Sequence, residues 1–508
     1  MQSFWKGWMV LPLLAVCGAI LGLSCENTAG QCELTAECTG APGVVPGACD
    51  PNIADGPIPD TCGTFVSASA SPGEADGSPA RPFTTFEQAI EAAASSGARV
   101  VYACAETFTE AVVLPADFVV YGGLDCKNGW ILGQEARTTI APDAGVPITF
   151  EAGETIHVEN VQALAPDGAP PDPASENPLS GGSSIAAIAR PGSKVELLRC
   201  DLVAGDGAPG TTIAPDPPGP AAPGGDPGEA ACAAQGNGGK GGKLECEQPT
   251  HGGDGGNGGQ DVMLDGSPGL AGGAGGTPGS GQLEDGTACT PGAAGSPGMT
   301  GEPGEGGKLV PELLDAAWKG SAGADGKNGR QGNGGGGGGG GKICTTLTRG
   351  AGGGGGGAGG CGGTAGKGGG AGGSSIALWA VDAGIALDRT TLVAGTAGGG
   401  AKGGDGQKGA LGGNGGVAGQ PAEGSQACDG GDGGNGGDGG PGGGGQGGSS
   451  IAVVWKKTAP TLTGSTVLTP GTAGGGGQGG ENGNEMSNGA AGLACTGFDT
   501  DKGECVSP

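Results

Sequence analysis

The chain has 508 residues, of which 128 are glycine and 37 are proline. Glycine and proline thus make up about a third of the chain, far above ordinary usage, which argues against a conventional globular enzyme. The formal charge is −29, from 52 acidic against 23 basic residues. Such a charge repels nucleic acid, so we expect no nucleic-acid partner. Large apolar residues are common in 100–205 and sparse in 206–373, so only the first of these segments is expected to bury a core.

Residues 1–24 are typical of a secretion signal peptide. Lys6 precedes an apolar run from Met9 to Leu23, which is too short for a comfortable membrane-spanning helix. The run ends in Leu-Gly-Leu-Ser-Cys25, which resembles a bacterial lipobox, although the family pattern has Leu where Gly22 stands. The resemblance implies that Cys25 receives a lipid chain and becomes the mature N-terminus. The alternative is a plain signal peptide cut near the same place.

The 17 cysteines indicate an exported, disulfide-bonded protein. Removal of Cys17 with the signal and lipidation of Cys25 would leave an odd number. One thiol is then free or pairs between chains, unless Cys25 is not lipidated. Segment 25–64 reads as a small stalk tied by disulfides, with candidate cysteines Cys32, Cys38, Cys49 and Cys62. Only two histidines and no Cys-x-x-Cys motif occur, so we expect no metal site and no cofactor.

One unit beginning Ser-Ser-Ile-Ala recurs three times, at 183–205, 374–395 and 449–471. In the first two copies Val195 and Leu197 align with Ile385 and Leu387, and Leu202 aligns with Leu392. Short alternating runs closed by glycine predict strands rather than helix. A unit this small must stack on its copies to bury an apolar face. We therefore expect each unit, with two strands, to form one coil of a parallel β-helix.

Glycine-rich segments 206–373 and 396–448 separate the units, and 472–508 forms a glycine-rich, cysteine-containing tail. The two insertions leave from the same corner and return through Gly-Gly-Ser-Ser. One interpretation is disordered, flexible loops, which the poly-Gly run 334–341 favours at that place. The other is a bundle of polyglycine-II-like strands. Its disulfide staples would come from the six cysteines Cys232, Cys246, Cys289, Cys344, Cys361 and Cys428. The collagen-like triplets from Gly292 are too few for an independent triple helix.

A helix is predicted upstream of the first strands. Thr85 and Gln88 have capping-box spacing, and the face shared by Phe86, Ala89, Ile90 and Ala93 is apolar. We expect this helix to cover the open first coil. The early strands end in Cys104 and Cys126, and because stacked strands lie ~4.8 Å apart these two cysteines should form a disulfide.

The runs DGSPARPFTTFEQAIEAA and ARVVYACAETFTEAVVLPADFVVYGGLDC are similar to the start of pectate-lyase-like proteins. With the lipobox and the glycine-rich segments, the chain resembles PGRS-type bacterial surface lipoproteins. The resemblance implies a mostly β fold, a right-handed parallel β-helix (solenoid). In it, 65–205 holds a capping helix and the first coils, 374–395 and 449–471 add coils, and the glycine-rich segments are loop insertions. It also implies a lipid-anchored location at the outer membrane or cell surface.

Catalytic chemistry has little support in the sequence. The phosphate-binding loop ending Gly-Lys-Ser/Thr is absent, so no nucleotide is expected, and His157 lies in an alternating strand run. The residues that come closest to a catalytic site are Arg199 and Arg389, which we expect to stack on each other. Ser465 is expected at the same position of the third copy. We interpret this stack as a solvated ladder ion-paired with Asp201, Asp388 and Glu196.

We therefore expect no catalytic residues. The sequence predicts a non-enzymatic surface lipoprotein with a structural, adhesive or matrix-contact role. Its expected partners are the membrane, through the lipid anchor, and extracellular polysaccharide or matrix. The alternative is a surface or secreted polysaccharide lyase or hydrolase. With 2 Tyr and 6 Trp, however, the chain is poor in the aromatic platforms that sugar-binding clefts use.

Overall fold

The computed structural model describes residues 47–508, except positions 55, 134, 176, 177, 274, 275, 310, 311, 315, 316 and 347. The chain divides into the units Met1–Val44 and Val45–Pro508, and all the described residues belong to the second unit. The predicted signal peptide, the lipidation site Cys25, and the stalk cysteines Cys32 and Cys38 lie outside the described residues.

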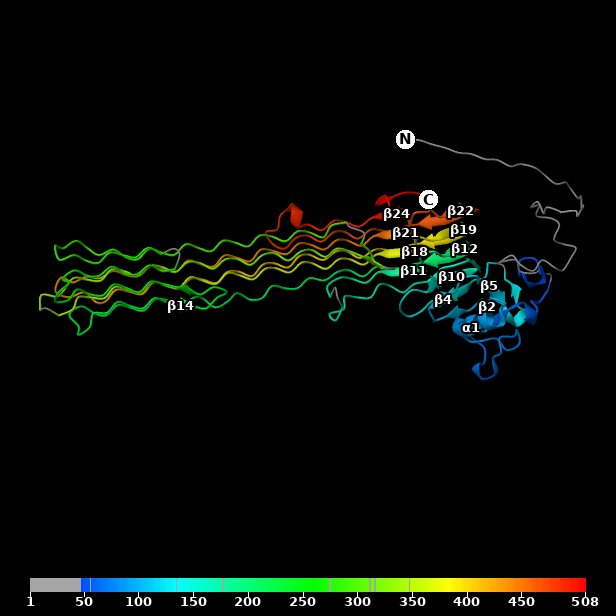
Figure 1. Ribbon diagram of the computed structural model, residues 1–508, viewed down its shortest axis with the longest axis horizontal. Coiled ribbons are helices and arrows are strands. Elements are labelled where there is room, and N and C mark those ends of the chain that lie inside the picture. The colour runs from blue at the N-terminus through cyan, green and yellow to red at the C-terminus, as the bar shows by residue number, and fades with distance from the viewer. Residues whose placement is uncertain are drawn as a thin grey trace, which may run out of the picture. The chain divides into compact units, whose positions relative to one another are not determined.

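Three stacks of parallel strands dominate this unit (Figure 1), so the mostly β prediction is confirmed. The first sheet contains, in spatial order, β1 (Thr64–Val66), β2 (Val100–Cys104), β5 (Val119–Asp125), β9 (Thr155–Glu159), β12 (Lys194–Leu198), β19 (Gly384–Asp388) and β22 (Thr461–Thr463). The short β6 (Ile131–Leu132) pairs antiparallel with β5.

The second sheet follows the same progression along the chain. It contains β3 (Thr107–Phe108), β7 (Thr138–Ile140), β10 (Val161–Leu164), β13 (Asp201–Val203), β20 (Thr391–Val393) and β23 (Val467–Thr469). The third sheet contains β4 (Val112–Leu114), β8 (Ile148–Phe150), β11 (Ser184–Ala189), β18 (Ser375–Val381), β21 (Ser450–Lys456), β24 (Ala494–Asp499) and an antiparallel last strand, β25 (Glu504–Cys505).

Each repeated unit contributes one strand to every sheet, three strands where the sequence predicted two. The predicted alignment of the first two units is confirmed, because Val195 pairs with Ile385 and Leu197 with Leu387 in the first sheet. Leu202 likewise pairs with Leu392 in the second sheet. These side chains are buried in one continuous apolar core, which explains why units of this length recur with the same apolar spacing.

The predicted helix is present as α1 (Phe86–Ser96). The Thr85 side chain accepts a hydrogen bond from the Gln88 amide at 3.3 Å, and the predicted face of Phe86, Ala89, Ile90 and Ala93 is buried. Phe86 packs edge-on against Phe108 of β3, with ring centroids 4.8 Å apart. The helix therefore covers the first strands, as expected from the need to protect an open sheet end.

The glycine-rich segments all connect the second sheet to the third. The chain leaves after β13 and β20 and returns at β18 and β21, and the same corner joins β10 to β11 and β23 to β24 (Figure 1). The second serine of each repeat closes this corner: its hydroxyl donates to one carbonyl and accepts one amide. The bonds join Ser184 to Pro166 and Gly205, Ser375 to Gly205 and Gly395, and Ser450 to Gly395 and Gly471.

Beyond this corner the chain forms a bundle of extended segments, here called the glycine bundle: the described residues of 206–373, 396–448 and 472–493 (Figure 1). Two small hairpins branch from it, β14 (Lys243–Leu244) with β15 (Thr250–His251), and β16 (Glu312–Leu314) with β17 (Ala317–Lys319). Single-turn helices occur at Gly47–Cys49, Asp60–Cys62, Pro72–Glu74, Cys126–Asn128 and Glu485–Ser487.

Candidate functional site

The segment 350–373 lies inside the glycine bundle, and its successive amides donate to three different neighbouring segments. Gly355 donates to Asp226, Gly356 to Gly253 and Gly357 to Gly431, at 2.8–3.0 Å. Its carbonyls accept bonds from the further segments 237–242, 323–341 and 398–419, and the carbonyl of Ala371 accepts one from Gly181. Hydrogen bonds that point in three directions with a three-residue repeat fit the left-handed threefold geometry of an extended polyproline-type chain. The packing is therefore that of polyglycine II.

The poly-Gly run 334–341 occupies a second interior position. Gly335 donates to Gly357, Gly336 to Ala293 and Gly337 to Leu270, each at 2.9 Å, and all eight residues of the run are buried. A Cβ added at Gly337 would lie 2.0 Å from the carbonyl oxygen of Asp254. The expectation that this run is flexible is therefore wrong, because glycine is required there for close approach of the chains. The structure has the packed alternative rather than the disordered one.

The amount of glycine in a segment follows the number of its neighbours. Cys361, Thr364 and Lys367 interrupt the glycines of 350–373 where one side of that segment is open. The collagen-like triplets from Gly292 form an outer segment, in which every third residue donates to 429–444 and most residues between are exposed. These triplets are thus an edge of the bundle and no triple helix.

On the surface of the bundle, consecutive Lys-Gly residues bind an aspartate of an adjacent segment. Asp438 accepts the Gly409 amide on one carboxylate oxygen at 3.0 Å and the Lys408 ammonium on the other at 2.9 Å. These two groups hold the pKa of Asp438 below its ordinary value. Asp254 with Lys240-Gly241, and Asp325 with Lys367-Gly368, repeat the arrangement. The aspartate thus accepts a hydrogen bond from a glycine amide that points outward, where no further segment offers a carbonyl.

Six disulfides link cysteines of the described chain. Three staple the bundle and use the six cysteines named for that role: Cys232–Cys344, Cys246–Cys361 and Cys289–Cys428. Cys104 is joined to Cys126, with Cα atoms 5.6 Å apart, which is the pairing expected from the stacking of β2 on β5. The others are Cys49–Cys62 and Cys495–Cys505.

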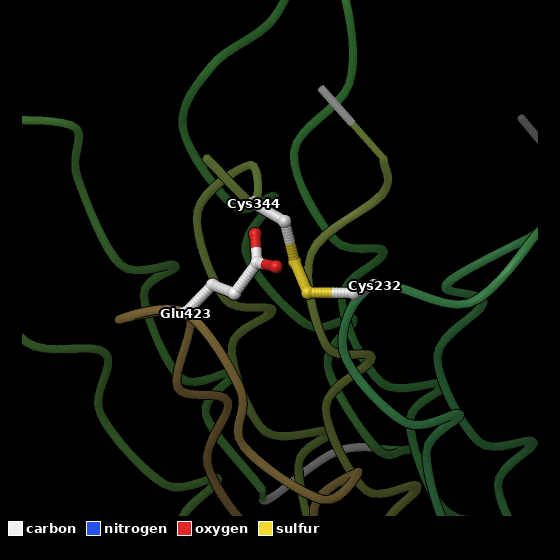
Figure 2. Close-up of side chains that lie close together, drawn as sticks. All are labelled: Cys232, Cys344 and Glu423. Atoms are coloured by element: carbon white, nitrogen blue, oxygen red, sulfur yellow. A yellow bond between two sulfur atoms is a disulfide. The ribbon is translucent and has the colours of Figure 1, made fainter. Parts of the chain in front are cut away.

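Glu423 lies beside the Cys232–Cys344 disulfide (Figure 2), and these three residues have the spacing of a metal-ligand set. The chemistry does not fit, because a thiolate is the metal ligand and both sulfurs are oxidised. The Glu423 carboxylate already accepts the hydroxyl of Thr345 at 2.7 Å and the amide of Thr346 at 3.1 Å. Cys232, Cys344 and Glu423 therefore form a structural contact in which a disulfide and the Glu423 hydrogen bonds hold a turn of the bundle.

The predicted arginine ladder is present in part. The Arg199 amide bonds to the carbonyl of Asp388, so Arg199 and Arg389 occupy the same corner of successive units, with φ of 50° and 49°. In the third unit the equivalent residue is Gly464, with φ of 58°, and not Ser465. The Arg389 amide donates to the Thr463 carbonyl, and Thr391 pairs with Val467. One residue separates Arg389 from Thr391, but two separate Gly464 from Val467, so Ser465 is an added residue at this corner.

The partners of the ladder differ from those predicted. Arg389 pairs with Asp388 at 3.0 Å as expected, but Asp201 lies 3.6 Å from Arg137, and Glu196 bonds to His157. Arg199 instead donates to Oε2 of Glu159 at 2.8 Å and to Oδ1 of Asn160 at 2.9 Å. Glu159 was missed in the sequence because it lies on β9, the strand paired with β12, and not on the repeated unit that contains Arg199.

Glu159 is the centre of a polar cluster on the outer face of the first sheet. It is 4% exposed and accepts bonds from Arg199, from Nδ2 of Asn52 at 2.8 Å, and from Nε2 of His157 at 2.7 Å. Burial raises the pKa of Glu159, but the His157 and Asn52 hydrogen bonds and the positive charges outweigh burial and lower it. Every member is engaged within the cluster, which ties segment 47–62 to the sheet through Asn52.

His157 lies in β9, as predicted, on the outer face of the sheet. Burial lowers its pKa, but bonds to Glu159 and Glu196 on either side outweigh burial and raise it above the ordinary value. Both ring nitrogens of His157 are thus engaged by carboxylates of the cluster, Nε2 by Glu159 and Nδ1 by Glu196.

Cys200 is the free cysteine of the described chain. Its thiol is buried at the corner slot that Thr390 fills in the next unit, and it points to the carbonyls of Val158 and Leu198 at 3.4 Å. Burial raises its pKa to about 12. A thiol that stays protonated is a poor nucleophile, so Cys200 substitutes structurally for threonine.

Two surface hollows lie away from the ladder. One, of about 450 Å³, lies beside Trp130 and the loop 67–82, and the other, of about 520 Å³, lies among the bundle turns at 233–234, 260–262 and 348–349. Trp130 is only 1% exposed and donates its indole N–H to Pro79, so it offers no stacking face to a sugar.

Comparisons with protein-family models, curated protein sequences and solved structures found no significant match. Within the described residues, no helix has the length and apolarity needed to span a bilayer.

Proposed function

We propose that this chain is a non-enzymatic, exported surface lipoprotein with a structural, adhesive or matrix-contact role. The observation that supports the proposal best is the glycine bundle. Its interior segments pack backbone against backbone, with hydrogen bonds in three directions. Three disulfides cross-link these segments. Such an element is suited to holding two points of a surface layer at a fixed separation.

Export and lipid anchoring are supported by the cysteines. Disulfides persist in oxidising compartments outside the cytosol. The six disulfides and Cys200 account for every cysteine beyond Cys38. If Cys32 pairs with Cys38, Cys200 is the odd thiol expected for a mature chain lipidated at Cys25. We therefore place the chain at the outer membrane or cell surface, held by a lipid on Cys25.

The proposal extends to the fold: the three parallel sheets form a right-handed parallel β-helix of the pectate-lyase-like, PGRS-type lipoprotein kind. Support comes from the order of the strands, because each coil visits the first, second and third sheet in turn. Parallel strands joined by crossovers are right-handed in about 98% of cases.

A polysaccharide panel separates this function from the lyase or hydrolase alternative. The purified protein is incubated with extracellular polysaccharides, and both retention and release of unsaturated or reducing ends are measured. We expect retention of a matrix polymer without release, unchanged in the Arg199→Ala, Arg389→Ala double variant, because both guanidinium groups are already ion-paired. Release that this double variant abolishes would contradict the proposal and support a lyase.

Anchoring has its own test. A Cys25→Ser chain should move from the membrane to the soluble fraction, with a Cys200→Ser chain as the matched control. Unchanged membrane retention of Cys25→Ser would contradict lipidation.

A further inference from the structure

The stack of strands has one covered end and one open end. At the first end α1 packs over β1, β2 and β4. At the other end the third sheet continues from β24 into β25. Within the described chain, the first and second sheets stop at β22 and β23 with no further strand beside them. Backbone groups along these two edges are therefore available to another strand.

The outward-facing residues carry no charge in the last strands of the first and second sheets, at this open end. In the second sheet the paired column runs Gln162, Asp201, Thr391, Val467, and Val467 is 49% exposed. In the first sheet the column runs His157, Glu196, Ala386, Thr461. Exposure to water alone favours the opposite order, and natural edge strands usually carry charges that block pairing.

The third sheet of the same molecule shows the usual protection. Its last hairpin, β24 to β25, carries Asp499, Asp501 and Glu504, and Lys502 pairs with Asp499 at 3.0 Å. By contrast, 458–480 contains no charged residue, although the chain as a whole has a charge of −29. Pro460 and Pro470 lie just outside β22 and β23 and leave the strands themselves able to pair.

We propose that the edge formed by β22 and β23 is the surface through which two copies of this chain associate. The edge strands pair antiparallel across a two-fold axis, so each copy uses the same residues. A second copy fits because the edge can pair with itself, and because 458–480 carries no charge, so two chains of −29 repel each other less at this edge than at the charged surfaces around it. Threonine and valine opposite their own kind are favourable cross-strand pairs.

Sedimentation velocity of the purified full chain in excess non-ionic detergent tests this association. The variants Val467→Lys and Thr461→Lys place a like charge opposite itself in the dimer. Val417→Lys is the matched control, because Val417 is 61% exposed on the bundle. We expect the native chain to dimerise with rising concentration, more strongly in high salt, which screens the net charge. Both edge variants should weaken dimerisation roughly tenfold or more, and the control should not.

Three results would overturn the proposal: a native chain that stays monomeric at all concentrations, a dimer that neither edge variant weakens, or a dimer that Val417→Lys weakens equally. The last result would place the contact on the bundle. Unfolding midpoints of the variants show whether each one folds. Because Val467 and Thr461 face outward, at least one edge variant is expected to keep the native midpoint.

Discussion

Arg199 and Arg389 lie one above the other at the same corner, but only Arg199 reaches a buried carboxylate. Arg199 meets Glu159, whose side chain is 6% exposed, whereas Arg389 meets its neighbour Asp388, which is 37% exposed. The two arginines hold the same position in the repeat, but the ion pair of Arg199 should contribute more to stability. A charge pair shielded from water interacts more strongly than an exposed one.

The first prediction uses these two arginines as each other's control. Arg199→Ala should lower the free energy of unfolding by about 1–3 kcal/mol, because it removes charged hydrogen bonds and leaves Glu159 with fewer partners. Arg389→Ala should cost ~0–1 kcal/mol. Both sites have the same positive φ, so backbone strain cancels in the comparison. Equal losses in denaturant titrations of the two variants would refute this distinction.

The second prediction concerns glycines that look alike in the sequence. A Cβ at Gly356 would lie 2.0 Å from the Gly335 carbonyl oxygen, whereas a Cβ at Gly475 would meet nothing within 4 Å. Gly356→Ala should therefore destabilise the bundle by about 1–3 kcal/mol or more through overpacking. Gly475→Ala should be neutral or stabilise by up to about 1 kcal/mol. Limited proteolysis and thermal unfolding compare the two; indistinguishable variants would argue against close packing.

The third prediction is a thiol map. Non-reducing peptide mapping should recover the six disulfides described above, Cys104–Cys126 among them. Cys200 should resist alkylation in the native chain and react only after denaturation, because its thiol is buried with a pKa of about 12. Rapid native labelling of Cys200, or Cys104 joined to another partner, would show that the strands near these residues are stacked differently.

The fourth prediction is a pH dependence with a defined sign. His157 has a raised pKa in the folded chain, so its contribution to stability is complete below its unfolded pKa of about 6.5 and is lost as pH rises through the folded value. Glu159 has a lowered pKa, so its contribution is present above its unfolded pKa of 4.5 and is lost as pH falls through the folded value.

Unfolding free energies of the native chain and of His157→Gln, measured across this range, test the sign. The stability difference between the two should shrink as pH rises from about 6.5 through the folded pKa of His157. A difference that grows with rising pH would mean that His157 is neutral in the folded state.

Local patterns made much of the fold predictable. The capping helix follows from Thr85 and the apolar face of Phe86, Ala89, Ile90 and Ala93, and the register follows from the repeats themselves. The position of Gly464 was missed because one added residue shifts the corner without changing the apolar pattern. Glu159 was missed because its contact with Arg199 depends on which strand lies beside which.

The glycine bundle could not be derived from composition alone. Disorder and polyglycine II need the same residue, and the two differ in the number of neighbouring segments, which is a non-local property. The signal was present in the spacing: glycine at every third position in 292–307 marks an outer segment, and uninterrupted glycine in 334–341 marks an interior one. The disulfide-forming cysteines pointed the same way, because a chain without an apolar core needs covalent staples.

Packing of the glycine-rich segments is the central claim, and amide hydrogen exchange tests it most directly. We predict slow exchange throughout 335–341, where every amide donates to another segment. We also predict a period of three in 295–304, where the glycines at 295, 298, 301 and 304 donate to 432–441 and exchange slowly. Exchange at the rate of an unstructured chain across 335–341, in a protein whose β-strands remain protected, would contradict the claim.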